Sequence, residues 1–68
     1  MRISLERRHV QMNAIADLAK RAKCTIEIVD KDGGDWYKVT QSNGVIRYIA
    51  WYDRLWCIVR NEAEWWER

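Results

Sequence analysis

The sequence contains no proline, no phenylalanine and only three glycines in 68 residues. Because flexible linkers are rich in glycine, serine or proline, we expect one domain over residues 1–68. No apolar run reaches the ~18 residues of a membrane span, and no apolar stretch follows the charged first residues, as it would in a secretory signal. The composition predicts a small globular protein that does not enter a membrane.

Residues that commonly carry chemistry are scarce. Cys24 and Cys57 are too few for a disulfide scaffold and lack the spacing of a zinc ribbon, and reduced thiols suit a cytoplasmic protein. We interpret Cys24 as a small hydrophobe, although Lys23 beside it would lower the pKa of a nucleophilic thiol. The single histidine, His9, has no partner set for catalysis or metal binding. We therefore predict no catalytic residue, no metal site, no cofactor and no enzymatic activity.

Hydrophobic periodicity predicts a helix followed by three strands. The helix covers residues 5–23, and the strands cover residues 24–30, 36–41 and 45–50. Between the first two strands, Asp32, Gly33, Gly34 and Asp35 are typical of a turn. They do not form a calcium loop, because the segment is too short and no glutamate closes it.

The last segment fits two interpretations. The composition of residues 55–60 would suit a fourth strand. Helical spacing instead favours a long helix with Asp53 as its N-cap, and we predict this helix. The fold class is then α+β, with the order α-β-β-β-α and both helices on one face of a three-stranded antiparallel sheet. The helical face consists of Tyr52, Leu55, Val59, Glu62, Ala63 and Trp66.

Asn43 and Gly44 predict a two-residue type I′ turn between the second and third strands. Such a turn would pair Ser42 with Val45 and would place Tyr48 on the apolar face that meets the helices. A register shift of one residue would exchange the faces. The opposite, open face would interleave aromatic and cationic side chains: Trp36, Lys38, Thr40, Arg47, Ile49 and Trp51.

The predicted order of elements resembles that of the double-stranded RNA-binding domain. That family grips phosphates with a cluster of lysines at the start of its last helix. The corresponding residues here are Trp51, Tyr52, Asp53, Arg54 and Leu55, which include no lysine. The resemblance therefore covers the order of the elements and does not imply an RNA-binding function.

The charge is uneven along the chain. The first 23 residues carry six cations and two carboxylates, whereas the other 45 residues carry six cations and eight carboxylates. A net charge of +2 is low for a nucleic-acid-binding protein, but the basic first third can form a local patch. The candidate nucleic-acid-binding residues are Arg7, Arg8, Lys20, Arg21, Lys23, Lys38 and Arg47, with Trp36 as a stacking platform.

Five tryptophans and three tyrosines are many for a core of this size. They either reinforce a small core or form a recognition surface, because Trp and Tyr are enriched in binding hot spots. A recognition surface predicts a non-catalytic module that binds a protein partner. The candidate partner-binding residues are Trp36, Trp51, Trp56, Trp65, Trp66, Glu62 and Glu64.

We favour a protein that acts stoichiometrically on its partner. Compact single-domain proteins without catalytic residues are common among phage and mobile-element accessory proteins, and anti-CRISPR inhibitors of host defence complexes are of this type. Two alternatives stay open: a small nucleic-acid-binding module, and a homodimer joined through the edge strand 24–30. An inhibitor of a nucleic-acid-handling complex would cover a basic site with acidic residues, here Asp30, Asp32, Asp35, Glu62, Glu64 and Glu67.

Overall fold

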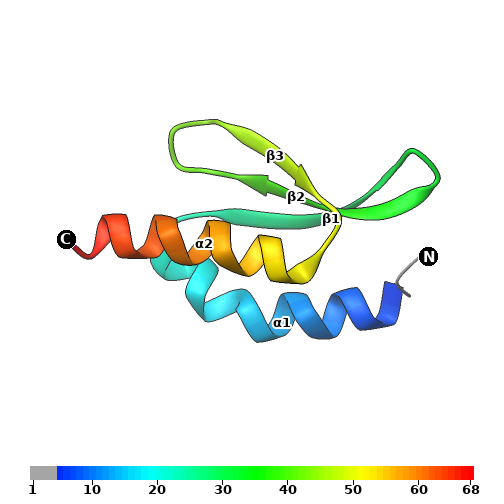
Figure 1. Ribbon diagram of the computed structural model, residues 1–68, viewed down its shortest axis with the longest axis horizontal. Helices are drawn as coiled ribbons and strands as arrows, with labels where there is room; N and C mark the ends of the chain where they lie inside the picture. Colours follow the sequence, from blue (N-terminus) through cyan, green and yellow to red (C-terminus); the bar gives the residue numbers. More distant parts are fainter. Residues whose placement is uncertain (1–4) are drawn as a thin grey trace.

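The computed structural model describes residues 5–68 and confirms the predicted order of elements. Helix α1 (Leu5–Ala22) precedes strands β1 (Thr25–Lys31), β2 (Gly34–Thr40) and β3 (Ile46–Ile49), and helix α2 (Tyr52–Trp66) follows them. The strands form one antiparallel sheet in the order β1-β2-β3, and both helices lie on one side of it (Figure 1). The chain is therefore a single α+β domain of two layers. Neither helix in residues 5–68 has the length and apolar character needed to cross a membrane.

Helix α2 excludes the fourth strand that we considered for residues 55–60. A strand would place Cys57 on the same face as Leu55 and Val59, but those two residues are buried and Cys57 is exposed. The predicted N-cap is wrong, because Trp51 occupies that position and makes no side-chain capping bond. Asp53 lies in the first turn instead, where its carboxylate still favours the positive end of the helix dipole.

Helix α1 ends at Ala22, one residue earlier than predicted, because Lys23 has a left-handed backbone conformation with a φ of 58°. The Cys24 amide donates to the Ala19 carbonyl, and the Lys23 amide donates to the Lys20 carbonyl. These two bonds form a Schellman motif, which satisfies carbonyls at the end of the helix. The motif places Lys23 where α1 turns into β1.

The type I′ turn occurs in the first hairpin and not in the second, where we predicted it. Lys31 pairs with Gly34, so the loop between β1 and β2 consists only of Asp32 and Gly33. Both loop residues have a positive φ, of 52° and 75°, as this turn type requires. The tight turn extends β1 and β2 beyond their predicted ends, so β2 begins at Gly34.

The second hairpin has a three-residue loop. The Gln41 amide donates to the Val45 carbonyl, and the Gly44 amide donates to the Gln41 carbonyl. Gly44 alone in this loop has a positive φ, of 89°, which is the geometry of a glycine bulge. The Asn43 side chain accepts a bond from the Val45 amide over 3.1 Å, so it satisfies a donor next to the bulge.

This longer loop shifts the register between β2 and β3 by one residue. Tyr37 pairs with Ile49, and Val39 pairs with Arg47. Cross-strand partners share a face, so Ile49 and Arg47 lie on the helix side and Tyr48 lies on the open side. Burial accounts for this register, because Ile49 is in the core and Tyr48 is exposed. The predicted open face is thus correct for β2 and wrong for β3.

Arg8 and Tyr37 add polar contacts to the apolar core. The Tyr37 hydroxyl donates to Gln11 Oε1, and the Arg8 guanidinium lies 4.9 Å from the centre of the Tyr37 ring. Arg8 Nη1 also donates to the Ala50 carbonyl over 2.8 Å, so Arg8 links α1 to both β2 and the end of β3. Burial raises the pKa of the Tyr37 hydroxyl, and Arg8 opposes this shift. The buried apolar residues around them are Ile15, Ala19, Ala22, Val39, Ile49, Leu55, Val59 and Ala63.

Candidate functional site

All five tryptophans lie outside the buried core. Trp51 and Trp65 expose 58% and 60% of their surface, Trp56 and Trp66 are also exposed, and Trp36 is half-buried. The core consists instead of aliphatic side chains, alanines and one tyrosine. The interpretation that the tryptophans reinforce the core is therefore not supported, and the cost of exposing so much aromatic surface requires another explanation.

Trp65 and Trp66 form the wall of a pocket at the C-terminal end of α2. Their ring centres are 4.8 Å apart, and their planes meet at 86°, so the edge of one ring packs on the face of the other. The pocket has a volume of about 370 Å³. We call it the Trp65–Trp66 pocket, and its lining residues are Ser42, Asn43, Glu62, Trp65 and Trp66.

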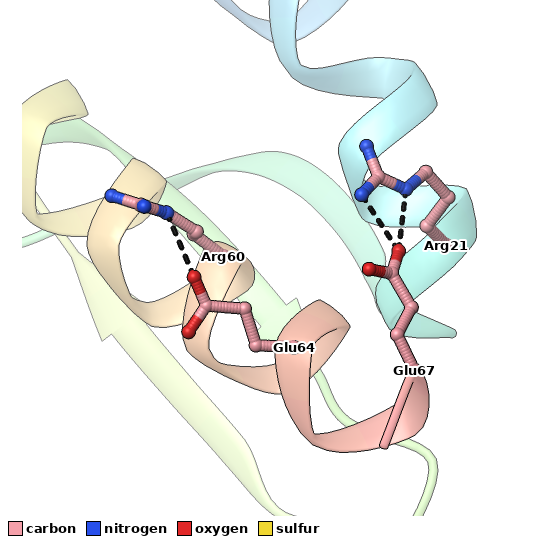
Figure 2. Close-up of polar contacts among 4 residues, drawn as sticks. All are labelled: Arg21, Arg60, Glu64 and Glu67. Atoms are coloured by element: carbon pink, nitrogen blue, oxygen red, sulfur yellow. Dashed lines mark hydrogen bonds and ion pairs between the residues drawn. The ribbon is translucent and has the colours of Figure 1, made fainter.

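Two ion pairs lie near the C-terminal end of α2. Glu67 accepts from Arg21 of α1 over 2.6 Å, and Glu64 accepts from Arg60 over 3.0 Å (Figure 2). Lys23, in the Schellman motif, places its Nζ 4.0 Å from the centre of the Trp66 ring. Two of the three predicted acidic residues at this end therefore already have a cationic partner within the chain.

Trp36 and Trp51 line a second hollow, away from the Trp65–Trp66 pocket. This hollow has a volume of about 230 Å³, and Arg8 and the β1–β2 turn contribute to its wall. Trp51 lies beyond the end of β3, so it is not part of the open sheet face on which we predicted it. On the open face, Lys31 Nζ lies 5.2 Å from the Trp36 ring centre and 5.5 Å from that of Tyr48.

The predicted basic residues do not gather on one face. Arg8 is 4% exposed and belongs to the core, and Arg21 is paired with Glu67. Lys38 lies on the open face of the sheet, whereas the register places Arg47 on the helix side. The remaining candidates on α1, Arg7 and Lys20, are exposed.

The cysteines and His9 show no catalytic arrangement. Burial raises the pKa of the half-buried Cys24 thiol, and the nearby Glu62 carboxylate raises it further. The net shift is upward, so the thiol is not activated. Cys57 and His9 are exposed. Within residues 5–68, no three histidine, cysteine or acidic side chains gather into a metal site.

Sequence reasoning missed several residues around the tryptophans. Ser42 and Asn43 line the Trp65–Trp66 pocket, although we assigned them only to a turn. We counted Lys23 among the phosphate-binding candidates, but it packs on Trp66. No local pattern marks these contacts, because they join segments that are distant in sequence. Tyr48 was misplaced because its face depends on the length of the loop.

Comparison with protein families, curated proteins and solved structures finds no match for this chain. Its function must therefore be inferred from the arrangement of its own residues.

Proposed function

We propose that this protein is a non-catalytic module that binds another protein stoichiometrically through its exposed tryptophans. The observation that carries the proposal is the position of all five tryptophans outside the core, with four of them exposed. Trp is among the residues most enriched in protein-binding hot spots, because a large aromatic surface is buried when the partner docks. Here that surface is present, and folding of the domain does not bury it.

The C-terminal end offers the best anchor for a partner. Trp65 is the most exposed of the tryptophans, and it lines a pocket next to Trp66. Glu62, Ser42 and Asn43 supply the polar groups that line this pocket beside the two indole rings. An apolar centre with a polar rim is the usual anatomy of a protein–protein interface.

We extend the proposal to mode of action and location. Occupation of a partner's surface is how small inhibitors of the anti-CRISPR type act, and we place this protein in that functional class, in the cytoplasm. The target would then be a host enzyme or defence complex. The tryptophan anchors support binding of this kind, and identification of the partner tests the assignment to this class.

A nucleic-acid-binding function is the second candidate, and one observation favours it. Lys31 and Lys38 share the open face of the sheet with Trp36 and Tyr48, an arrangement that can stack bases and hold phosphates. Against it, Arg8 is buried, Arg21 is paired, and Arg47 lies on the other side of the sheet. The protein-binding function therefore has the stronger support.

Affinity capture distinguishes the two functions. The tagged protein is incubated with lysate of its source cells, with and without nuclease, and bound proteins are identified by mass spectrometry. A Trp65→Ala variant tests the anchor, and Val10→Ala is the matched control, because Val10 is exposed and lies on α1. Light scattering of the purified protein detects self-association through the edge strand β1.

We expect one protein complex to be recovered equally with and without nuclease, retained by Val10→Ala and lost by Trp65→Ala. Recovery that disappears with nuclease would refute protein binding and favour the open face. In that case affinity for single-stranded nucleic acid would fall steeply with salt concentration.

A further inference from the structure

We infer that the Trp65–Trp66 pocket receives a basic side chain, arginine or lysine, from the protein partner. The inference rests on the proposed function and adds the chemistry that the pocket recognises. Two indole rings form its apolar wall, and the Glu62 carboxylate supplies negative charge at the same place. A cation that packs on an aromatic face and pairs with a carboxylate is held by both.

Glu62 is a half-buried carboxylate without a cation. Within residues 5–68 it forms no ion pair and no side-chain hydrogen bond, whereas its neighbours Glu64 and Glu67 are each paired with an arginine. It is close enough to the Cys24 thiol to raise the pKa of that group. A partly buried charge without a partner is unfavourable, so an incoming cation binds more favourably at Glu62 than at Glu64 or Glu67, whose charges are already paired.

The protein itself already shows how a cation packs at this site. Lys23 Nζ lies 4.0 Å from the Trp66 ring centre, a distance at which the ammonium is attracted by the face of the indole. Trp36 and Trp56 also have a cation of the chain over their rings. Across the part of the chain that the structure describes, no cation lies over Trp65. The Trp65 ring is therefore available to a cation from another molecule.

The size and rim of the pocket suit a long side chain. Its volume of about 370 Å³ is near the lower limit of ligand sites, about 300 Å³, and is enough for one arginine or lysine side chain. Ser42 and Asn43 of the β2–β3 loop close the side that faces the sheet, and their side-chain oxygens can accept bonds from a guanidinium or an ammonium.

The experiment titrates ¹⁵N-labelled protein with three capped tripeptides whose central residue is arginine, lysine or citrulline. Citrulline keeps the shape of arginine without its charge. The indole N–H signals of Trp65 and Trp66 report binding, and affinities on the order of 1–10 mM are expected for a single side chain. The variants are Trp65→Ala, Glu62→Gln and the matched control Glu64→Gln, which removes a carboxylate already paired with Arg60. A thermal melt confirms that each variant is folded.

We expect the arginine and lysine peptides to shift both indole signals in a saturable manner and the citrulline peptide to bind about fivefold more weakly, the size expected from one ion pair. Glu62→Gln should reduce binding of the charged peptides to the citrulline level, Trp65→Ala should abolish it, and Glu64→Gln should leave it unchanged. Equal binding of citrulline and arginine, an unaffected Glu62→Gln variant, or no shift at about 50 mM peptide would overturn the inference.

These failures are separate from failure of the proposed function. Lysate capture that depends on Trp65 but not on Glu62 would leave protein binding intact and refute recognition of a basic side chain. Charged-peptide binding without nuclease-resistant capture would refute the proposed function and leave the chemistry of the pocket established.

Discussion

Replacement of Arg8 by alanine tests whether this residue is part of the core. The guanidinium donates to the Ala50 carbonyl and lies over the Tyr37 ring, and both contacts would be lost. A hydrogen bond from a charged donor contributes about 1.5–3 kcal/mol, and a desolvated cation–π contact about 2 kcal/mol. Within residues 5–68, Arg8 Nε is buried without a hydrogen-bond partner, and this unsatisfied group cancels about 1–3 kcal/mol of the stabilisation. We therefore expect Arg8→Ala to lower the free energy of unfolding by about 2 kcal/mol, the middle of the resulting range of about 0.5–4 kcal/mol.

For a chain of 68 residues the total stability is only roughly 3–10 kcal/mol, so this loss is large. The midpoint of thermal unfolding should fall by about 8–16 °C. Circular dichroism during heating and in urea gives both quantities. Arg7→Ala is the matched control, because Arg7 is the adjacent residue of the same type and is exposed. We expect its effect to lie within about 0.5 kcal/mol.

Equal stability of the two arginine variants would refute the assignment of Arg8 to the core. It would also return Arg8 to the set of residues available for a phosphate. A third variant, Arg8→Met, keeps much of the side-chain volume without the charge, and it should recover part of the loss if packing contributes.

Three further predictions follow from the turns and the buried groups. Gly33→Ala should destabilise the protein by about 1 kcal/mol, because the φ of Gly33 is 75°. Gly34→Ala should leave the stability unchanged, because a Cβ at that position would meet other atoms only at 3.7 Å and beyond. Urea unfolding of both variants checks this difference. Tyr37→Phe should cost about 1 kcal/mol at pH 7, because Gln11 Oε1 loses its donor. The pKa of Tyr37 is raised in the folded state, so the hydroxyl contributes fully to the free energy of unfolding below the unfolded pKa of about 10. This contribution is lost as the pH rises above that value and through the higher folded-state pKa. The free energies of unfolding of the wild type and Tyr37→Phe should therefore become equal in urea titrations at alkaline pH. Glu62→Gln should lower the pKa of the Cys24 thiol without restoring it to its usual value, because burial is the larger cause of the rise. Thiolate absorbance in a Cys57→Ser background measures this pKa. An unchanged pKa would mean that Glu62 is not near the thiol.

The sequence was sufficient for the order of the elements but not for the choice between its two turns. Asp32 with Gly33 and Asn43 with Gly44 both carry the signature of a two-residue type I′ loop, and only the first pair adopts it. The second loop gains the Asn43 bond to the Val45 amide and brings Ile49 into the core. The burial of Ile49 depends on helices that are distant in sequence, so no local sequence rule predicts which loop length the second hairpin adopts.

Charged residues at apolar positions of a helix are a more informative sequence signal than the turn signatures. Arg8 continues the spacing of Met12, Ile15 and Ala19 along α1, and Glu62 lies on the same side of α2 as Leu55 and Val59. We placed Glu62 on the apolar side of its helix, but we assigned Arg8 to the nucleic-acid-binding candidates although the same helical spacing brings it to the buried side. Helical spacing could not predict which of them would find a partner there, because the partners of Arg8 are in β2 and after β3.

Arg8 and Glu62 differ in whether their charge has a partner within the chain, and this difference predicts which of them contributes to stability and which to recognition. Arg8 has a carbonyl and an aromatic ring of its own chain as partners, so its removal should weaken the fold. Glu62 forms no ion pair or side-chain hydrogen bond within residues 5–68, so loss of its charge should leave the fold intact. Besides the pKa of the Cys24 thiol, it should change only the binding of a cation from outside. If both Glu62→Gln and Arg8→Ala were to destabilise the protein, Glu62 would be a structural residue. The argument that its unpaired charge attracts a cation into the Trp65–Trp66 pocket would then fail. If Glu62→Gln melts like the wild type and binds the arginine peptide only as weakly as the citrulline peptide, the carboxylate serves recognition and not stability.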